Sequence, residues 1–261
     1  MINSFLPIFV GSILLALSTS FLGSLIIWNR MTSFGDTISH SSMLGLSLGI
    51  FFHIDPFYSV LIVSLLLTII ILIFEKYSTL SINTLLSIMS HFFLSLGIIL
   101  MSILSGIRKI NISSYLFGDL ISINFFDLTA IFFSTVIVLS FVIFRWKNML
   151  STIVNYELAT LDGVNVFKER LILMFLVAFT ISLLVKLFGV LIINSLLIIP
   201  SSSVQRFSKS PENMVFFSII ISILCILIGL FFSRKYNLPI SPSIVLCSSL
   251  FFILGFFKKQ N

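Results

Sequence analysis

Two side chains in the N-terminal part of the chain could bind a metal ion. Asp36 and His40 lie four residues apart in the run RMTSFGDTISHSSMLGLSLG, which begins at Arg30. At this spacing two residues lie on one face of a helix, one turn apart. A carboxylate oxygen and an imidazole nitrogen form a ligand pair that suits zinc, manganese or iron(II). The pattern therefore predicts a helical face that contacts metal, and the alternative is that the pair caps the helix in interfacial water.

The same helix carries a second stripe, made of small residues. Ser41, Gly45 and Gly49 again recur at a spacing of four, rotated by about a third of a circle from the first stripe. Small residues allow another helix to approach closely within a membrane. We therefore expect one polar face toward a cavity and one small-residue face against a neighbouring helix.

The composition is that of a membrane protein. Hydrophobic residues make up 58% of the 261 residues and charged residues 9%, and the mean hydropathy is +1.21. No soluble domain could bury so much apolar surface, so we expect an all-α polytopic membrane protein. The basic residues do not cluster on one face, which argues against binding of nucleic acid. Cys225 and Cys247 lie in apolar segments and are expected to be core residues.

Charged breaks divide the chain into apolar segments of about 20 residues, the length that spans a bilayer. The expected helices are 5–28, 34–52, 57–74, 83–104, 125–144, 170–186, 188–204, 213–233 and 240–257. Only Gly189 separates 170–186 from 188–204, and these two could form one bent element, so we expect eight or nine spans. With Arg30 in the cytoplasm, ten basic residues lie inside and five outside. This distribution agrees with the positive-inside rule and predicts an outer N-terminus and a cytoplasmic C-terminus.

The longest polar interruption is the loop 146–169. Within it, Asn155 can cap a short helix, Glu157 suits the first turn, and Gly163 can end the helix in a left-handed conformation. Such a helix is too short to be stable alone, so we expect another structure to pack on it. The alternative is an ordinary loop with one helical turn.

A third histidine, His91, lies inside the expected span 83–104. A titratable side chain at membrane depth usually faces the interior of a bundle. His91 is therefore a possible metal ligand or a hydrogen-bonded core residue. His53 and Asp55 precede Pro56 in a turn that we expect to be wet, with Pro56 at the start of the next helix.

The sequence lacks the common catalytic motifs. It has no G-x-x-x-x-G-K-[ST] loop for nucleotide phosphates. It also lacks H-E-x-x-H, and its acidic residues are scattered singly. Its one match to G-x-S-x-G, at Gly45–Gly49, falls inside the apolar segment 34–52. We therefore expect a transport subunit rather than an enzyme, driven by a partner or by a gradient.

Four stretches, in order along the chain, resemble the metal-type ABC importer permeases. They are Met31–Gly49, Tyr115–Leu120 (YLFGDL), Leu191–Pro200 (LIINSLLIIP) and Ser241–Cys247 (SPSIVLC). The likeness covers nearly the whole chain and is strongest to the zinc-uptake branch of the family.

This resemblance implies a single permease domain over residues 1–261, with a type II-like helix bundle in a bacterial inner membrane. It implies four kinds of partner: two cytoplasmic ATPase subunits, a periplasmic zinc-binding protein, a second copy of the chain and the lipid membrane. Zn²⁺ would be the transported substrate, and no permanent cofactor is implied. Asp36 and His40 would contact the metal, and two copies would supply two nitrogen and two oxygen ligands. The residues implied in coupling to the ATPase are Asn155, Glu157, Ala159 and Gly163, within the segment of about 146–169.

Other transport functions use the same ligands. A manganese or iron(II) importer permease accepts an Asp–His pair equally well, so the preference for zinc rests on the resemblance. A secondary transporter or metal channel would work without an ATPase and often contains an inverted repeat, which the sequence does not show. A polytopic membrane enzyme would need a nucleophile and a base in proximity, and no such pattern is evident.

Overall fold

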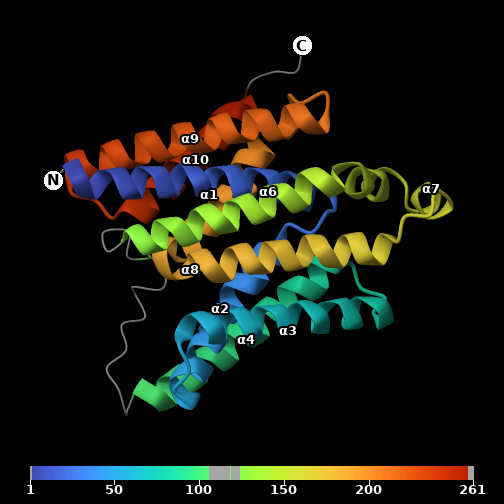
Figure 1. Cartoon of the computed structure of the whole chain (residues 1–261), viewed down its shortest axis with the longest axis horizontal. Coiled ribbons are helices and arrows are strands. Elements are labelled where there is room, and N and C mark those ends of the chain that lie inside the picture. The colour runs from blue at the N-terminus through green and yellow to red at the C-terminus, as the bar shows by residue number, and fades with distance from the viewer. Residues whose placement is uncertain (1, 106–117, 119–123, 258–261) are drawn as a thin grey trace. The chain divides into compact units, whose positions relative to one another are not determined.

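The computed structural model describes residues 2–105, 118 and 124–257, and every regular element in these ranges is a helix (Figure 1). The helices are α1 (Ile2–Trp28), α2 (Ser33–Phe52), α3 (Pro56–Tyr77), α4 (Ile82–Ser105), α6 (Phe125–Val154), α7 (Tyr156–Leu161), α8 (Val166–Gln205), α9 (Pro211–Tyr236) and α10 (Ile240–Phe257). The predicted all-α class is confirmed. Arg108, Lys109, the run Tyr115–Leu120 apart from Gly118, and the C-terminal Lys258 and Lys259 lie outside the described residues.

Among the described residues, five helices are long and apolar enough to cross a membrane. They lie within α1, α3, α4, α6 and α9. Ile192–Gln205 and Ile240–Gly255 are shorter apolar helices. The segments predicted at 170–186 and 188–204 are two helices that meet at a kink within α8. Its kink lies at Gly189, where φ is 74° and ψ is 160°. Glycine adopts this backbone conformation without the steric penalty that a Cβ would bring.

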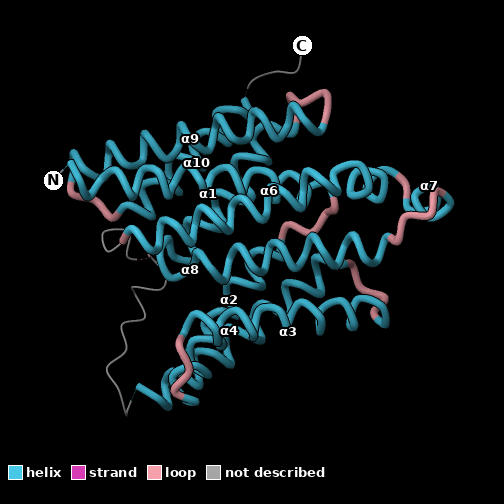
Figure 2. Tube along the Cα trace, viewed as in Figure 1, coloured by secondary structure: helices cyan, strands magenta, loops and turns pink. Residues whose placement is uncertain are grey.

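The polar interruption before α8 is shorter than the predicted 146–169. The stretch from Phe125 to Val154 contains no Gly or Pro, so α6 continues past the expected membrane boundary to Val154. α8 begins at Val166, and the side chain of Asn165 accepts a hydrogen bond from the backbone N–H of Lys168 at 3.0 Å. Non-helical residues are thereby confined to the two ends of α7 (Figure 2).

The chain forms two compact units. Unit 1 comprises Met1–Ile27, Ile112–Leu139 and Leu184–Asn261, and unit 2 comprises Trp28–Asn111 and Ser140–Leu183. Long helices α6 and α8 each contribute to both units.

Unit 1 is held together by serines and by a glycine contact. A Cβ built at Gly23 of α1 would lie 1.7 Å from the carbonyl oxygen of Leu197, so α1 and α8 touch backbone to backbone. Serine hydroxyls then bridge these helices and α9, which compensates for the lack of water in a membrane interior. The pairs are Ser20–Ser222 at 3.1 Å, Ser24–Ser201 at 3.4 Å and Ser201–Ser218 at 2.8 Å.

In unit 2, α2 packs closely against α3 through its small-residue face. A Cβ at Gly45 would lie 2.7 Å from Val60 Cα, and one at Gly49 would lie 2.9 Å from Ser59 Cβ. The Ser59 hydroxyl donates a hydrogen bond to the Gly45 carbonyl oxygen. The predicted close approach of a neighbouring helix is therefore confirmed.

On a different face, α2 packs against α4. The Thr37 hydroxyl donates a hydrogen bond to the Leu86 carbonyl oxygen at 2.9 Å. A Cβ at Gly97 would lie 2.7 Å from the Leu44 backbone nitrogen. The residue numbers in these two contacts increase together on both helices, so α2 and α4 run parallel in this region.

We expect Gly45→Ala to weaken unit 2 even though alanine favours helix formation. The added Cβ meets the α3 backbone, and overpacking of this kind costs about 1–3 kcal/mol. The measurement is the midpoint of thermal unfolding of the detergent-purified protein.

The control is Gly11→Ala in α1, where the nearest atoms to a new Cβ lie 3.5 Å away, at an ordinary contact distance. An unfolding midpoint for Gly45→Ala equal to that of Gly11→Ala would contradict the close contact between α2 and α3.

Candidate metal path and coupling segment

Asp36 lies inside α2 rather than at its cap. The N-cap position is held by Thr32, whose side chain makes no capping hydrogen bond. Asp36 falls in the first turn, where the helix dipole favours a negative charge. His40 follows one turn later on the same helix. The predicted i, i+4 placement is therefore present.

Asp36 and His40 are accessible on a helix that is mostly buried between its first turn and Gly49. Thirteen of the 20 residues of α2 are buried, because α3 and α4 pack against it. Asp36 is nevertheless exposed, and His40 is half-buried. The two groups also interact electrostatically. The carboxylate of Asp36 and the imidazole of His40 are thus both accessible on the part of α2 that α3 and α4 leave uncovered.

His91 lies on α4, close to this pair. Its side chain is exposed and interacts electrostatically with His40. Within the described ranges, however, no three or more His, Cys, Asp or Glu side chains are grouped closely enough to hold a metal ion. One copy of the chain therefore presents the Asp36–His40 pair with His91 beside it, and no closed metal cage.

His53 and Asp55 have structural positions. His53 ends α2 in a left-handed conformation, with φ at 57°. Asp55 caps α3 by accepting a hydrogen bond from the Phe57 backbone N–H at 2.8 Å, and Pro56 is the first residue of that helix. Both His53 and Asp55 are exposed, as expected for a wet turn.

The short helix predicted between the long helices is α7. The Asn155 side chain accepts hydrogen bonds from the backbone N–H groups of Glu157 at 2.9 Å and Leu158 at 3.1 Å. Gly163 has φ at 78°, and its N–H donates to the Thr160 carbonyl oxygen at 3.1 Å. The predicted cap and the predicted left-handed end are both confirmed.

Two large apolar side chains are exposed on α7 next to polar ones, which the sequence reasoning missed. Ala159, expected among the coupling residues, is only 1% exposed, and its carbonyl oxygen accepts a hydrogen bond from the Val164 N–H at 2.9 Å. In contrast, Leu158 is 58% exposed and Leu161 is 82% exposed. Two leucines three residues apart in a six-residue helix were the available signal, since so short a helix cannot bury every side.

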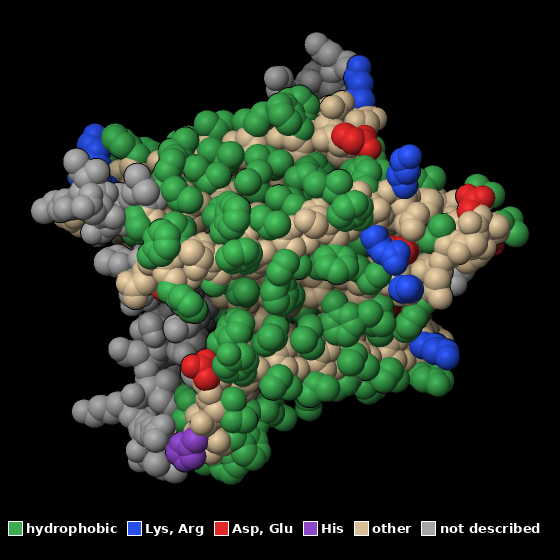
Figure 3. Space-filling view, in the orientation of Figure 1, with side chains coloured by type: hydrophobic (Ala, Val, Ile, Leu, Met, Phe, Trp, Pro, Cys, Tyr) green, Lys and Arg blue, Asp and Glu red, His purple; other side chains and the backbone are tan. Residues whose placement is uncertain are grey.

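The helix that follows α7 is anchored to two others by ion pairs. Glu169 is 3% exposed, and its carboxylate lies 3.0 Å from the Arg145 guanidinium of α6. The next residue, Arg170, lies 2.6 Å from the Glu75 carboxylate of α3. Over α3, α6 and α8 the Lys and Arg side chains gather at the end toward α7, and much of the surface beyond them is hydrophobic (Figure 3).

A hydroxyl contact ties α8 to α3 further along its length. The Ser64 and Ser182 hydroxyl oxygens lie 2.5 Å apart. This contact and the Arg170–Glu75 ion pair join α8 to α3 at two positions along the helices. α3 in turn packs against α2. The segment around α7 and the helix that carries Asp36 therefore belong to one connected group of helices in unit 2.

Curated relatives match this chain over nearly its full length. A protein of Buchnera aphidicola subsp. Schizaphis graminum, described as the high-affinity zinc uptake system membrane protein ZnuB, is 50% identical over 253 residues, which are 97% of each chain. The ZnuB protein of Haemophilus influenzae is 44% identical over 98% of this chain and 97% of its own length. The manganese import system permease protein ScaB of Streptococcus gordonii is 27% identical over 95% of this chain and 88% of its own length.

A solved structure has the same fold. PsaBC from Streptococcus pneumoniae in complex with Fab superposes with a TM-score of 0.83 at 26% sequence identity, covering 96% of this chain and 90% of the other. The family model for the ABC 3 transport family matches residues 1–259. The fold, the near full-length identity to curated relatives and this match agree, and the chain belongs to the ABC 3 transport family.

Proposed function

We propose that this chain is the membrane-spanning permease subunit of an ATP-binding-cassette importer that takes up zinc. The observation that carries the proposal is identity of 44–50% to proteins described as ZnuB, over 96% or more of this chain. The relative described as a manganese permease is 27% identical. The transport subunit itself is not an enzyme, since nucleotide hydrolysis belongs to a separate subunit in this class of importer.

The metal would pass Asp36 and His40. Their accessibility in a largely buried part of α2 supports this role, because a passing ion needs ligands that it can reach. Two copies of the chain would bring two carboxylates and two imidazoles to one axis, a ligand set suited to zinc. Such a station must bind the ion weakly enough to release it.

ATP hydrolysis in the partner subunits would be coupled to metal transport through α7. We assign the docking of two ATPase subunits to the exposed Leu158 and Leu161, with Glu157 beside them. Asn155, Ala159 and Gly163 would act indirectly, because their observed contacts shape the helix that presents the leucines. This places α7 in the cytoplasm, the N-terminus outside and the C-terminus inside. The membrane would be the bacterial inner membrane, with zinc delivered by a periplasmic binding protein.

The metal station predicts a large effect from small changes in ligand chemistry. Asp36→Asn keeps the shape of the side chain and removes the charge, and His40→Leu removes the nitrogen. We expect each to abolish zinc uptake while insertion and ATPase association remain normal. Uptake is measured in cells that carry the complete transporter with the variant permease, and insertion by the amount of protein in the membrane fraction.

Matched controls are available in the exposed turn after α2. Asp55→Asn removes a charge and keeps a capping side chain, and His53→Asn removes an imidazole at a left-handed position that asparagine tolerates. Both controls should transport at the wild-type rate. Wild-type uptake by the double variant Asp36→Asn, His40→Leu would show that these two residues only cap and pack.

The docking surface predicts that polarity on α7 disrupts assembly. In the double variant Leu158→Ser, Leu161→Ser, the backbone contacts of α7 remain, but the apolar contact with a partner is lost. We expect the permease to insert normally and to copurify with at least about tenfold less ATPase, which corresponds to a loss of about 1.4 kcal/mol in binding.

Thr160→Ala serves as the control, since Thr160 is exposed on the same helix and its hydroxyl bonds only to the Glu157 carbonyl oxygen. Undiminished ATPase copurification with the double serine variant would remove α7 as the docking element, even if zinc transport itself persisted.

A further inference from the structure

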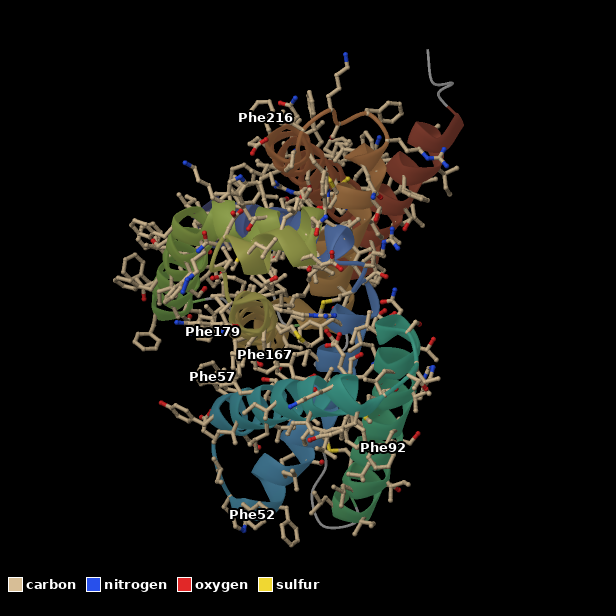
Figure 4. All side chains as sticks on the ribbon, turned by 90° about the vertical axis from the view of Figure 1, so that its right-hand side faces the viewer. Phe52, Phe57, Phe92, Phe167, Phe179 and Phe216 are labelled. Atoms are coloured by element: carbon tan, nitrogen blue, oxygen red, sulfur yellow. The ribbon has the colours of Figure 1, made fainter. Side chains whose placement is uncertain are left out.

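The exposed face of α4 carries a mostly polar stripe and an apolar stripe side by side. The stripe that contains His91 consists of Thr84, Ser87, His91, Ser95, Ile98 and Ser102, all exposed, and it is polar except at Ile98. The apolar edge consists of Ile88, Phe92, Ile99 and Ile103, each more than half exposed. Phe92 marks this edge in Figure 4. The opposite side of α4 is buried, so the two stripes share the surface that unit 2 leaves open.

This division indicates two different surroundings for α4. Apolar side chains on an exposed face suit lipid, whereas an ionisable side chain within a span is costly there and faces water or another polar group. His91 lies at the middle of the polar stripe, between Ser87 and Ser95. Its surroundings on α4 are therefore those of a hydrated path.

The packing of α2 on α4 places His91 at the level of His40. The two contacts that fix the register are Thr37 with Leu86 and Leu44 with Gly97. His40 lies three-sevenths of the way from Thr37 to Leu44. The position at the same fraction of the segment from Leu86 to Gly97 lies between residues 90 and 91. His91 is therefore opposite His40 along the length of the two helices.

Both imidazoles also lie on the same side of this parallel pair. Successive residues of a helix are rotated by about 100° about its axis. The side chain of His40 is therefore rotated by about 50° from the side of α2 that faces α4, which Thr37 and Leu44 define. On α4, the side chain of His91 is rotated by about 130° from the side of the helix that faces α2, which Leu86 and Gly97 define. Because the two helices are parallel, this rotation brings His91 to the same side of the helix pair as His40. The electrostatic interaction between His40 and His91 agrees with this placement.

We propose that His91 is a further metal contact on the transport path, next to Asp36 and His40, and that its imidazole helps to select zinc over manganese. The inference rests on the proposed function, because it extends the same path by one ligand. Within the described residues the three groups do not form one closed site. His91 is therefore a successive contact for the moving ion, and Ser87 and Ser95, on either side of it, are the polar side chains next to this contact.

The chemistry of the added ligand decides what it selects. Imidazole nitrogen suits zinc well, whereas manganese prefers carboxylate, carbonyl and water oxygen. A path that offers one carboxylate and two imidazoles per copy is therefore richer in nitrogen than manganese prefers. His91→Gln removes the nitrogen ligand at similar size, and His91→Asp replaces it with a ligand for manganese.

The test compares these variants in the complete transporter, by zinc uptake in cells and by equilibrium binding of zinc and manganese to the purified complex. We expect His91→Gln to lower zinc uptake by about tenfold or more, since even residues that only orient a metal ligand change affinity by about 10–100-fold. We also expect a lower ratio of zinc to manganese affinity in both variants. His91→Asp should retain more uptake than His91→Gln, because it keeps a ligand.

His53→Asn is the control, and Asp36→Asn separates this inference from the proposed function. If Asp36→Asn abolishes uptake but His91→Gln changes neither uptake nor the affinity ratio, the inference about His91 is wrong and the proposed path stands. A fall in uptake with an unchanged affinity ratio would make His91 a structural residue and would also overturn the inference. If Asp36→Asn, His40→Leu and His91→Gln all transport normally, the path itself is wrong.

Discussion

Close backbone contact around α2 is the constraint on which the candidate metal path depends. Glycines on both sides of the interfaces let α3 and α4 approach α2 nearly backbone to backbone, at Gly45 and Gly49 on one face and at Gly97 on the other. A membrane interior offers little hydrophobic drive between helices, so such contacts and hydroxyl bonds supply the stability. The consequence is functional, because a helix held this tightly keeps its one polar opening, at Asp36 and His40, in a fixed place.

A connected set of contacts joins α2 to the candidate coupling segment α7. Glu169 and Arg170, adjacent on α8, pair with two different helices, and Ser182 adds a second tie to α3. Because α8 follows α7 directly, a force on α7 acts on helices that are already linked to α2. Unit 2 therefore contains both the candidate metal contacts and the helices linked to the candidate coupling segment. The buried Glu169 needs Arg145 for the same reason that any buried charge needs a partner.

Much of this could be predicted from the sequence, where local chemistry alone determines the outcome. The spacing of Asp36 and His40, the small-residue stripe, the Asn155 cap, the left-handed Gly163 and the break at Gly189 each follow from helix geometry or from the conformational freedom of glycine. The charged residues from Arg145 to Lys147 predict the end of an apolar span but do not end the helix, and nothing in the backbone stops α6 before Asn155. The burial of Ala159 and the exposure of Leu158 and Leu161 could not be predicted, since they depend on how a six-residue helix folds back on its own ends. The proximity of His91 to His40 likewise depends on the register between two helices, which one sequence does not specify.

The most direct test of the account is metal uptake in a bacterial strain that lacks its own zinc importer permease and carries this chain with its ATPase and binding protein. Radioactive zinc, manganese and iron are supplied in parallel at low concentration, with and without an ATPase variant that cannot hydrolyse ATP. The account predicts that the chain restores zinc uptake alone, and only with the active ATPase. Restoration of manganese or iron uptake in place of zinc, or zinc uptake that persists with the inactive ATPase, would contradict it.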